Sequence, residues 1–167
     1  MNPSLKVRRK QANYLDCGTP GVPAIEFLGT GFKDLNEEPG AQTSSKRYIN
    51  SKSSSKGITG YEWQSPFSAD QIRSEKAIEY ICSIGELQKT GAEAEADYYI
   101  VDLDKPAEPP KENTFKARKI HIAIELSNFG SEDGEMTCEG NFLGVSDVEV
   151  GTFDTSTKKF TPAVVGA

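Results

Sequence analysis

The chain has 167 residues, of which 36% are apolar, so it suits one domain and two complete cores would be cramped. Its 25 acidic and 19 basic residues give a formal charge of -6, whereas proteins that grip nucleic acid usually carry a basic domain. Three scattered cysteines, Cys17, Cys82 and Cys138, are too few for a disulfide framework, and we expect buried or inert thiols.

Residues 1–12 form a basic, polar arm, with cations concentrated between Lys6 and Lys10. Such an arm is either a solvated tail or a segment that packs on an acidic neighbouring molecule. No apolar segment follows it, so no signal peptide is expected, and no run reaches the roughly 18 apolar residues that a membrane span requires. We expect a single domain over residues 13–162 and a short tail over residues 163–167.

The first strands are expected in short pieces bounded by glycine and proline. Residues 24–28 form an apolar run between a turn signal at 18–21 and Gly29-Thr30-Gly31. Residues 43–49 and 58–63 indicate a long hairpin. Its connection contains no apolar residue, so it cannot join a monomer's core and should be mobile unless another molecule holds it. The connection consists of Asn50, Ser51, Lys52, Ser53, Ser54, Ser55, Lys56 and Gly57.

One helix is predicted over about residues 68–85. Ser68 and Gln71 have the spacing of a capping box, and Phe67 and Ile72 stand where a hydrophobic staple would. An apolar stripe with helical spacing follows, and a glycine at position 85 or 91 ends the helix. Because the stripe covers one side only, the helix should lie half exposed across an open end or face of a sheet. The stripe consists of Ile78, Ile81, Cys82 and Ile84.

The rest of the chain is rich in strand signals. Residues 97–103 alternate, with Tyr98 and Ile100 on the face opposite to Tyr99 and Val101. The strongest alternation places Ile120, Ile122, Ile124 and Leu126 on one face, and Lys119, His121, Ala123 and Glu125 on the other. Strands at 136–145, 148–153 and 159–161 complete a meander. The predicted fold class is mainly β: a β-barrel or sandwich of about seven to nine strands with one flanking α-helix.

No clustered set of catalytic or metal-binding residues is visible in the sequence. His121 is the only histidine, which excludes a multi-histidine zinc site, and we interpret it as a partly exposed sheet residue. Ser53 and Lys56 match an S-x-x-K pattern that a serine-rich loop produces by chance. Asp102 and Asp104 are interpreted as solvated carboxylates at a strand end. We therefore expect no enzyme activity, no cofactor and no metal.

Several motifs follow one another between residues 27 and 63. They are Leu28-Gly29-Thr30-Gly31-Phe32, Asn36-Glu37-Glu38-Pro39-Gly40-Ala41-Gln42-Thr43 and Lys46-Arg47-Tyr48-Ile49-Asn50. Further motifs are Phe115-Lys116-Ala117-Arg118-Lys119, Gly134-Glu135 before Gly140-Asn141, and Gly151-Thr152-Phe153 before Lys159-Phe160-Thr161-Pro162. In their order and spacing, from about residue 7 to 162, they resemble the tail tube (major tail) proteins of long-tailed phages and prophages of Gram-positive bacteria.

The resemblance implies a barrel or sandwich with a flanking helix, six copies of which close a ring around a channel. Rings would stack through a long loop and terminal arms, enclose the tape-measure protein, contact other tail proteins and later conduct DNA without binding it specifically. The implied protein is a non-enzymatic virion component, assembled in the cytoplasm of the host bacterium without membrane contact. Sheath-bearing and flexible tails use similar tubes, so the resemblance leaves both particle types open.

Two sets of residues are candidates for roles in assembly. The loop from Asn50 to Gly57 is expected to mediate ring-to-ring contact. Carboxylates near strand ends are expected to make the channel negative, because like charge keeps DNA off the wall. They are Glu37, Glu38, Asp102, Asp104, Glu132 and Asp133. Two alternatives stay open: another virion β domain, such as a capsid decoration or tail-terminator protein, and a ligand-binding β module that uses Tyr61, Trp63 and Tyr99.

Overall fold

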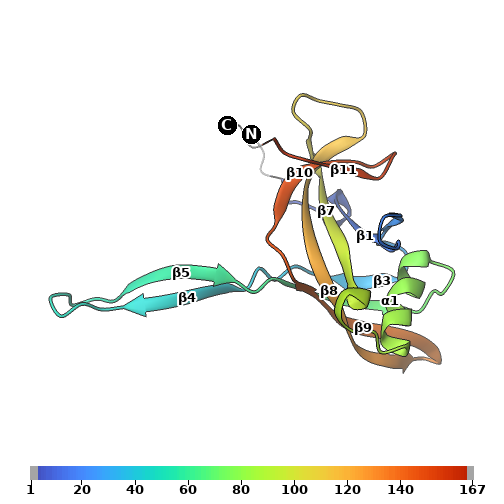
Figure 1. Cartoon of the computed structure of the whole chain (residues 1–167), viewed down its shortest axis with the longest axis horizontal. Helices are drawn as coiled ribbons and strands as arrows, with labels where there is room; N and C mark the ends of the chain where they lie inside the picture. The colour runs from blue at the N-terminus through green and yellow to red at the C-terminus, as the bar shows by residue number, and fades with distance from the viewer. Residues whose placement is uncertain (1–3, 165–167) are drawn as a thin grey trace.

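The computed structural model describes residues 4–164 and is mainly β (Figure 1). Residues 1–3 of the expected N-terminal segment and residues 165–167 of the expected C-terminal tail lie outside the described residues. The helices are η1 (Arg8–Lys10), α1 (Lys76–Glu86) and η2 (Gly91–Ala94). The strands are β1 (Gln11–Asp16), β2 (Ile25–Phe27), β3 (Phe32–Leu35), β4 (Ala41–Lys46), β5 (Ser55–Tyr61), β6 (Gln64–Asp70), β7 (Glu95–Pro106), β8 (Thr114–Glu132), β9 (Glu135–Gly144), β10 (Glu149–Asp154) and β11 (Lys159–Pro162).

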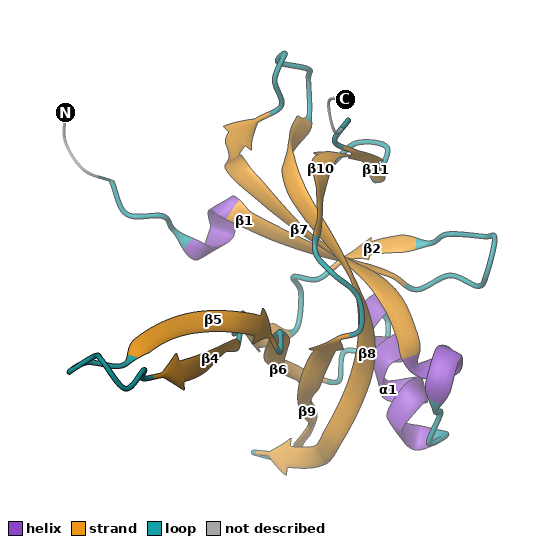
Figure 2. Ribbon diagram, turned by 60° about the vertical axis from the view of Figure 1, so that its left-hand side comes forward, coloured by secondary structure: helices purple, strands orange, loops and turns teal. Residues whose placement is uncertain are grey.

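A nine-stranded antiparallel sheet forms the body and curls into a half-barrel (Figure 2). Its strand order is β2-β1-β7-β8-β9-β6-β3, and β10 pairs with both β8 and β11. The 19-residue β8 is long enough to pair with β10 near its start and with β9 along the rest. The remaining strands, β4 and β5, form a separate two-stranded sheet. The mainly β fold with one flanking α-helix is therefore confirmed.

The main core lies between the sheet and α1. Side chains of a strand alternate between its two faces, and the expected apolar face of β8 is turned inward, where Ile122 is fully buried. Tyr98 and Ile100 of β7 face the same core, and the apolar stripe of α1 packs against it. Burying an isoleucine side chain contributes about 1.5–3 kcal/mol, so this layer is a major source of stability.

A second, smaller core occupies the other face of the sheet. Tyr99 and Val101 of β7 pack there against Phe153 of β10, together with Tyr14 and Phe160. Both faces of β7 are therefore buried along Tyr98 to Val101, as the predicted alternation of these residues requires. A strand that is buried on both faces has a continuous run of apolar residues, which explains why residues 98–101 are all apolar or aromatic.

The predicted start of the helix is wrong. Ser68 and Phe67 belong to β6, which pairs with β3 and β9, and α1 begins at Lys76 without a side-chain cap. Gln71 does not reach back to a helix end but donates its side-chain amide to the carbonyl oxygen of Thr137 at 3.0 Å. The buried Phe67 and Ala69 alternate with more exposed neighbours, so strand pairing on both sides outweighs the local capping pattern. The helix end near Gly85 is confirmed.

Two strands near the N-terminus were not predicted. β1 lies between β2 and β7 in the sheet, and it begins at Gln11, inside the N-terminal segment 1–12 that was expected to be a polar extension. β3 pairs with β6 at the opposite edge. The rest of the basic segment also contacts the body: Lys6 Nζ lies 3.0 Å from Asp102, and Arg8 donates to Asn13 Oδ1 at 2.8 Å.

Candidate interaction surfaces

The hairpin of β4 and β5, here called the arm (residues 41–61), projects from the body along the longest axis of the molecule (Figure 1). Every residue of β4 is exposed, as is all of β5 except the half-buried Gly60. The two strands pair only with each other, with Ala41 opposite Tyr61 and Lys46 opposite Ser55. A lone two-stranded hairpin is at best marginally stable in water, so we expect contact with another molecule to stabilise the arm.

The tip of the arm differs from the predicted connection in its bounds. The structure places the connection at residues 47–54, and Ser55, Lys56 and Gly57 already belong to β5. Apolar side chains near the tip, Tyr48 and Ile49, are fully or largely exposed, with Ile58 and Tyr61 exposed further along the arm. The arm therefore presents apolar surface that its own subunit does not cover.

The arm is also strongly basic. It carries Lys46, Arg47, Lys52 and Lys56 and no acidic residue, which gives a formal charge of +4 and leaves -10 on the rest of the chain. Among the ion pairs of residues 4–164, none involves these four side chains. The positive charge of the arm is thus available to another molecule.

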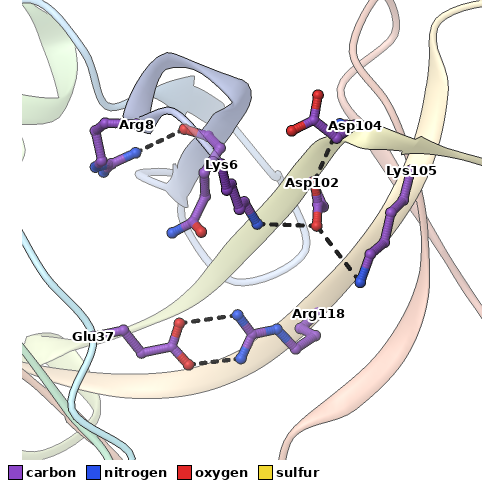
Figure 3. Close-up of polar contacts among 8 residues, drawn as sticks. Lys6, Arg8, Glu37, Asp102, Asp104, Lys105 and Arg118 are labelled. Atoms are coloured by element: carbon purple, nitrogen blue, oxygen red, sulfur yellow. Dashed lines mark hydrogen bonds and ion pairs between the residues drawn. The ribbon is translucent and has the colours of Figure 1, made fainter. Parts of the chain in front are cut away.

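Glu37, one of the six carboxylate candidates, is held by a bidentate ion pair with Arg118 (Figure 3). The distances are 2.6 and 2.9 Å, and the Trp63 indole donates to the same carboxylate at 3.1 Å. Burial raises the pKa of Glu37, but the hydrogen bonds from Arg118 and Trp63 outweigh it, and the pKa is lowered overall. Its negative charge is therefore largely compensated. Glu38 next to it accepts a hydrogen bond from Gln64 at 2.5 Å.

Asp102 and Asp104 lie near Arg118 in the same region (Figure 3). Asp102 is flanked by Lys6 at 3.0 Å and Lys105 at 3.8 Å, and accepts the backbone N–H of Asp104 at 3.1 Å. Burial raises its pKa, but the contacts with Lys6 and the N–H of Asp104 lower it overall. Asp104 itself is exposed. Of these two aspartates, only Asp104 offers a carboxylate without a cation beside it among the described residues.

The last two candidates, Glu132 and Asp133, lie at the other end of β8, roughly 45 Å of strand from Arg118. Asp133 and Gly134 both have positive φ, 51° and 84°, the conformation of a tight two-residue hairpin turn between β8 and β9. Glu132 forms an ion pair with Lys33 at 3.1 Å. The six candidates therefore do not form one surface.

A different acidic surface was missed by the sequence reasoning. Asp34, Glu125 and Glu139 are exposed on the face of β3, β6, β9 and β8 that points away from α1. Register places Asp34 and Glu139 on either side of Ser68, whose hydroxyl donates to Asp34 at 3.1 Å. None of the three carboxylates has an ion pair within residues 4–164. The alternation of β8 signalled Glu125, but the other two depend on strand pairing.

The half-buried His121 lies between two carboxylates. Its Nδ1 is 2.9 Å from Asp97 and its Nε2 is 3.1 Å from Glu95, so both ring nitrogens donate only when the imidazole is protonated. Burial lowers the pKa of His121, but the hydrogen bonds of Asp97 and then Glu95 outweigh it, and the pKa is raised above 6.5. His121 is thus more than the plain sheet residue that the sequence suggested.

The ligand-binding alternative does not gain a complete site. Tyr61 and Trp63 line one hollow of about 400 Å³ together with Glu37 and Arg118, whereas Tyr99 is buried in the second core. The three aromatic donors are therefore not brought together. Cys82 and Cys138 are buried and Cys17 half-buried, all as free thiols. Residues 4–164 contain no cluster of His, Cys, Asp and Glu side chains suited to a metal ion. No helix in that range is long and apolar enough to cross a membrane.

No protein-family model and no curated protein sequence matches this chain. Its fold is similar to that of solved structures. One is a chain in the tail of an empty GTA particle with C6 symmetry, with a TM-score of 0.58 over 86% of this chain and 97% of that chain at 11% identity. A chain in the anti-feeding prophage (AFP) baseplate, 6-fold symmetrised, gives a TM-score of 0.49 over 90% and 96% at 6% identity. The chain thus shares its fold with a subunit of a six-fold symmetric particle tail.

Proposed function

We propose that this chain is the tail tube subunit of a phage-like particle, a non-enzymatic protein whose copies close into six-membered rings that stack around a channel. The observation that carries the proposal is the arm, which projects without packing on its own subunit, in a fold shared with a chain of a C6-symmetric tail. The motifs between residues 27 and 63 extend the proposal to the tubes of long-tailed phages and prophages of Gram-positive bacteria. The proposed setting is the virion tail, after assembly in the host cytoplasm.

Unpaired sheet edges support self-association. The half-barrel ends in short strands, the three-residue β2 and the four-residue β3 and β11. Edge strands present free N–H and C=O groups, and a closed ring of subunits removes such edges. We propose that neighbours in a ring cover these edges and that the sheet continues from one subunit to the next.

The arm is proposed to make the contact between rings. The proposed contact uses the predicted loop from Asn50 to Gly57, whose last three residues belong to β5, together with the exposed apolar residues Tyr48 and Ile49. Burying these side chains against a neighbour would stabilise both the contact and the hairpin itself. A tape-measure protein inside the tube and other tail proteins at its ends are the further partners.

The channel wall is proposed to be acidic. Among Glu37, Glu38, Asp102, Asp104, Glu132 and Asp133, the ion-paired Glu37, Asp102 and Glu132 would contribute little net charge to it. Asp34, Glu125 and Glu139 have no such partners, and the sheet face that bears them is open. We add these three residues to the channel candidates, because uncompensated like charge lets DNA slide past without sticking.

Replacing residues 47–54 by Asn-Gly tests the assignment. Lys46 and Ser55 are directly opposite in the ladder, so a two-residue turn can join them without disturbing the body. We expect folded subunits with unchanged far-ultraviolet circular dichroism that no longer form tubes. The measurement is negative-stain microscopy of concentrated protein beside the unaltered chain. Normal tubes from the shortened chain would refute the role of the arm. An unaltered chain that never forms tubes would favour a decoration or tail-terminator protein.

A further inference from the structure

Building on the proposed function, we infer that the arm docks by charge attraction into an acidic groove at the far end of a second copy. The groove has a volume of about 710 Å³ and lies between the β1–β2 turn, Tyr80 in the middle of α1, the segment after α1, η2 and the start of β7. Its carboxylates are Asp16, Glu93, Glu95 and Asp97. The occupant is thus the +4 arm of another subunit of the same chain.

The groove is suited to a cation-bearing ribbon. Glu93 is exposed and has no ion pair within residues 4–164, whereas Asp16 uses one oxygen to accept the N–H groups of Gly18 and Ala24. Against these carboxylates stand Lys89, His121 held between Glu95 and Asp97, and Lys119, which lies 3.7 Å from Asp97. The acidic groups outnumber the cations, so the groove attracts positive charge.

Apolar walls give the groove a second match to the arm. The ring of Tyr80 and the prolines Pro20 and Pro23 line it. The tip of the arm exposes Tyr48 and Ile49 beside its cations, and these side chains need such a surface. The groove combines these apolar side chains with its carboxylates, which is why we assign the groove rather than the sheet face around Glu125.

The placement of the two surfaces excludes docking within one molecule. The arm and α1 lie at opposite ends of the long axis in Figure 1 and again on opposite sides in Figure 2. A contact between two different surfaces of identical subunits is a head-to-tail contact, which generates closed rings or extended stacks. The arm therefore reaches its groove only in an assembly.

Charge reversal on both surfaces tests this docking. The arm variant R47E/K52E and the groove variant A92K/E93K change only exposed residues, which form no ion pair in the described part of the chain. At about 0.1 M salt, where the screening length is about 10 Å, each variant alone should raise the protein concentration needed for tubes at least about tenfold. Combining them should restore tubes at a concentration within about threefold of the unaltered chain. Pelleting assays and negative-stain microscopy measure this.

The sheet-face variant D34K/E125K serves as the matched control. It adds the same kind of charge to an exposed acidic surface, and combining it with R47E/K52E should not restore tubes. Rescue by D34K/E125K, failure of A92K/E93K to rescue, or normal assembly of R47E/K52E would each overturn the docking. In all three cases tubes from the unaltered chain would leave the proposed function intact. Thermal unfolding of every variant, with a midpoint near that of the unaltered chain, verifies that the subunits fold.

Discussion

The hydroxyl of Tyr98 should contribute measurably to stability, whereas that of the adjacent Tyr99 should not. Tyr98 is only 1% exposed, and its hydroxyl accepts a hydrogen bond of 2.6 Å from the side-chain amide of Asn13, itself 2% exposed. Asn13 in turn accepts a hydrogen bond from Arg8. Tyr98→Phe removes the acceptor and leaves a buried N–H group without its partner in a site that solvent does not reach.

The expected cost follows from that unpaired donor. Leaving a buried polar group unsatisfied costs about 1–3 kcal/mol. For a chain of this size, about 2 kcal/mol lowers the thermal midpoint by roughly 4–8 °C. Tyr99 offers a control of the same chemistry on the same strand, because it is 5% exposed but its hydroxyl makes no hydrogen bond within residues 4–164. Tyr99→Phe should therefore change stability by less than about 0.5 kcal/mol.

Urea unfolding followed by circular dichroism, at concentrations too low for assembly, measures both variants. The free energy of unfolding of Tyr98→Phe should fall clearly below that of Tyr99→Phe, with an unchanged dependence on urea concentration. Equal destabilisation by the two substitutions would refute the argument, because it would show that the hydrogen bond to Asn13 carries no net stabilisation. The comparison does not depend on the function of the chain.

Two further predictions concern particular residues. Because the pKa of His121 is raised in the folded state, its ion pairs with Asp97 and Glu95 stabilise the fold below about pH 6.5 and this contribution disappears as the pH rises through the folded pKa. The effect should be roughly 0.5 kcal/mol for a half-exposed group, and urea titrations of His121→Gln should lack it. At Gly140 a Cβ atom would overlap the carbonyl oxygen of Glu125, so Gly140→Ala should lower the free energy of unfolding by about 1–3 kcal/mol. Gly57→Ala, where an added Cβ atom would meet no other atom within 4 Å, should be nearly neutral. Urea unfolding measures both variants.

Much of the fold could be predicted where one element carries its own periodic signal. The alternation in β8 placed Ile120, Ile122, Ile124 and Leu126 on the core face correctly, with Leu126 partly buried, and the stripe of α1 identified its buried face. The hairpin was visible because two strand-like segments flank a polar connection. In these segments the spacing of the apolar residues predicts which face is buried, so the packing partners did not have to be known.

The sequence-based prediction failed where pairing with strands distant in the sequence determines the structure of a segment. Ser68 and Gln71 have the spacing of a helix cap, yet pairing with β3 and β9 makes this segment a strand. β1 was missed because its sequence, with Asn13 and Tyr14 in the middle, shows no simple alternation, and it is buried on both sides by partners distant in sequence. The charge of Glu37 could not be judged either, since Arg118 lies 81 residues away.

The sequence by itself therefore determined the class of the fold, the face of β8 that is buried and the existence of an exposed hairpin, because these depend on residues close together in the chain. Only the tertiary structure decided which carboxylates keep their negative charge, that the basic arm points away from its own acidic groove, and where the helix starts. Those properties depend on long-range pairing, which brings together groups that no local pattern connects.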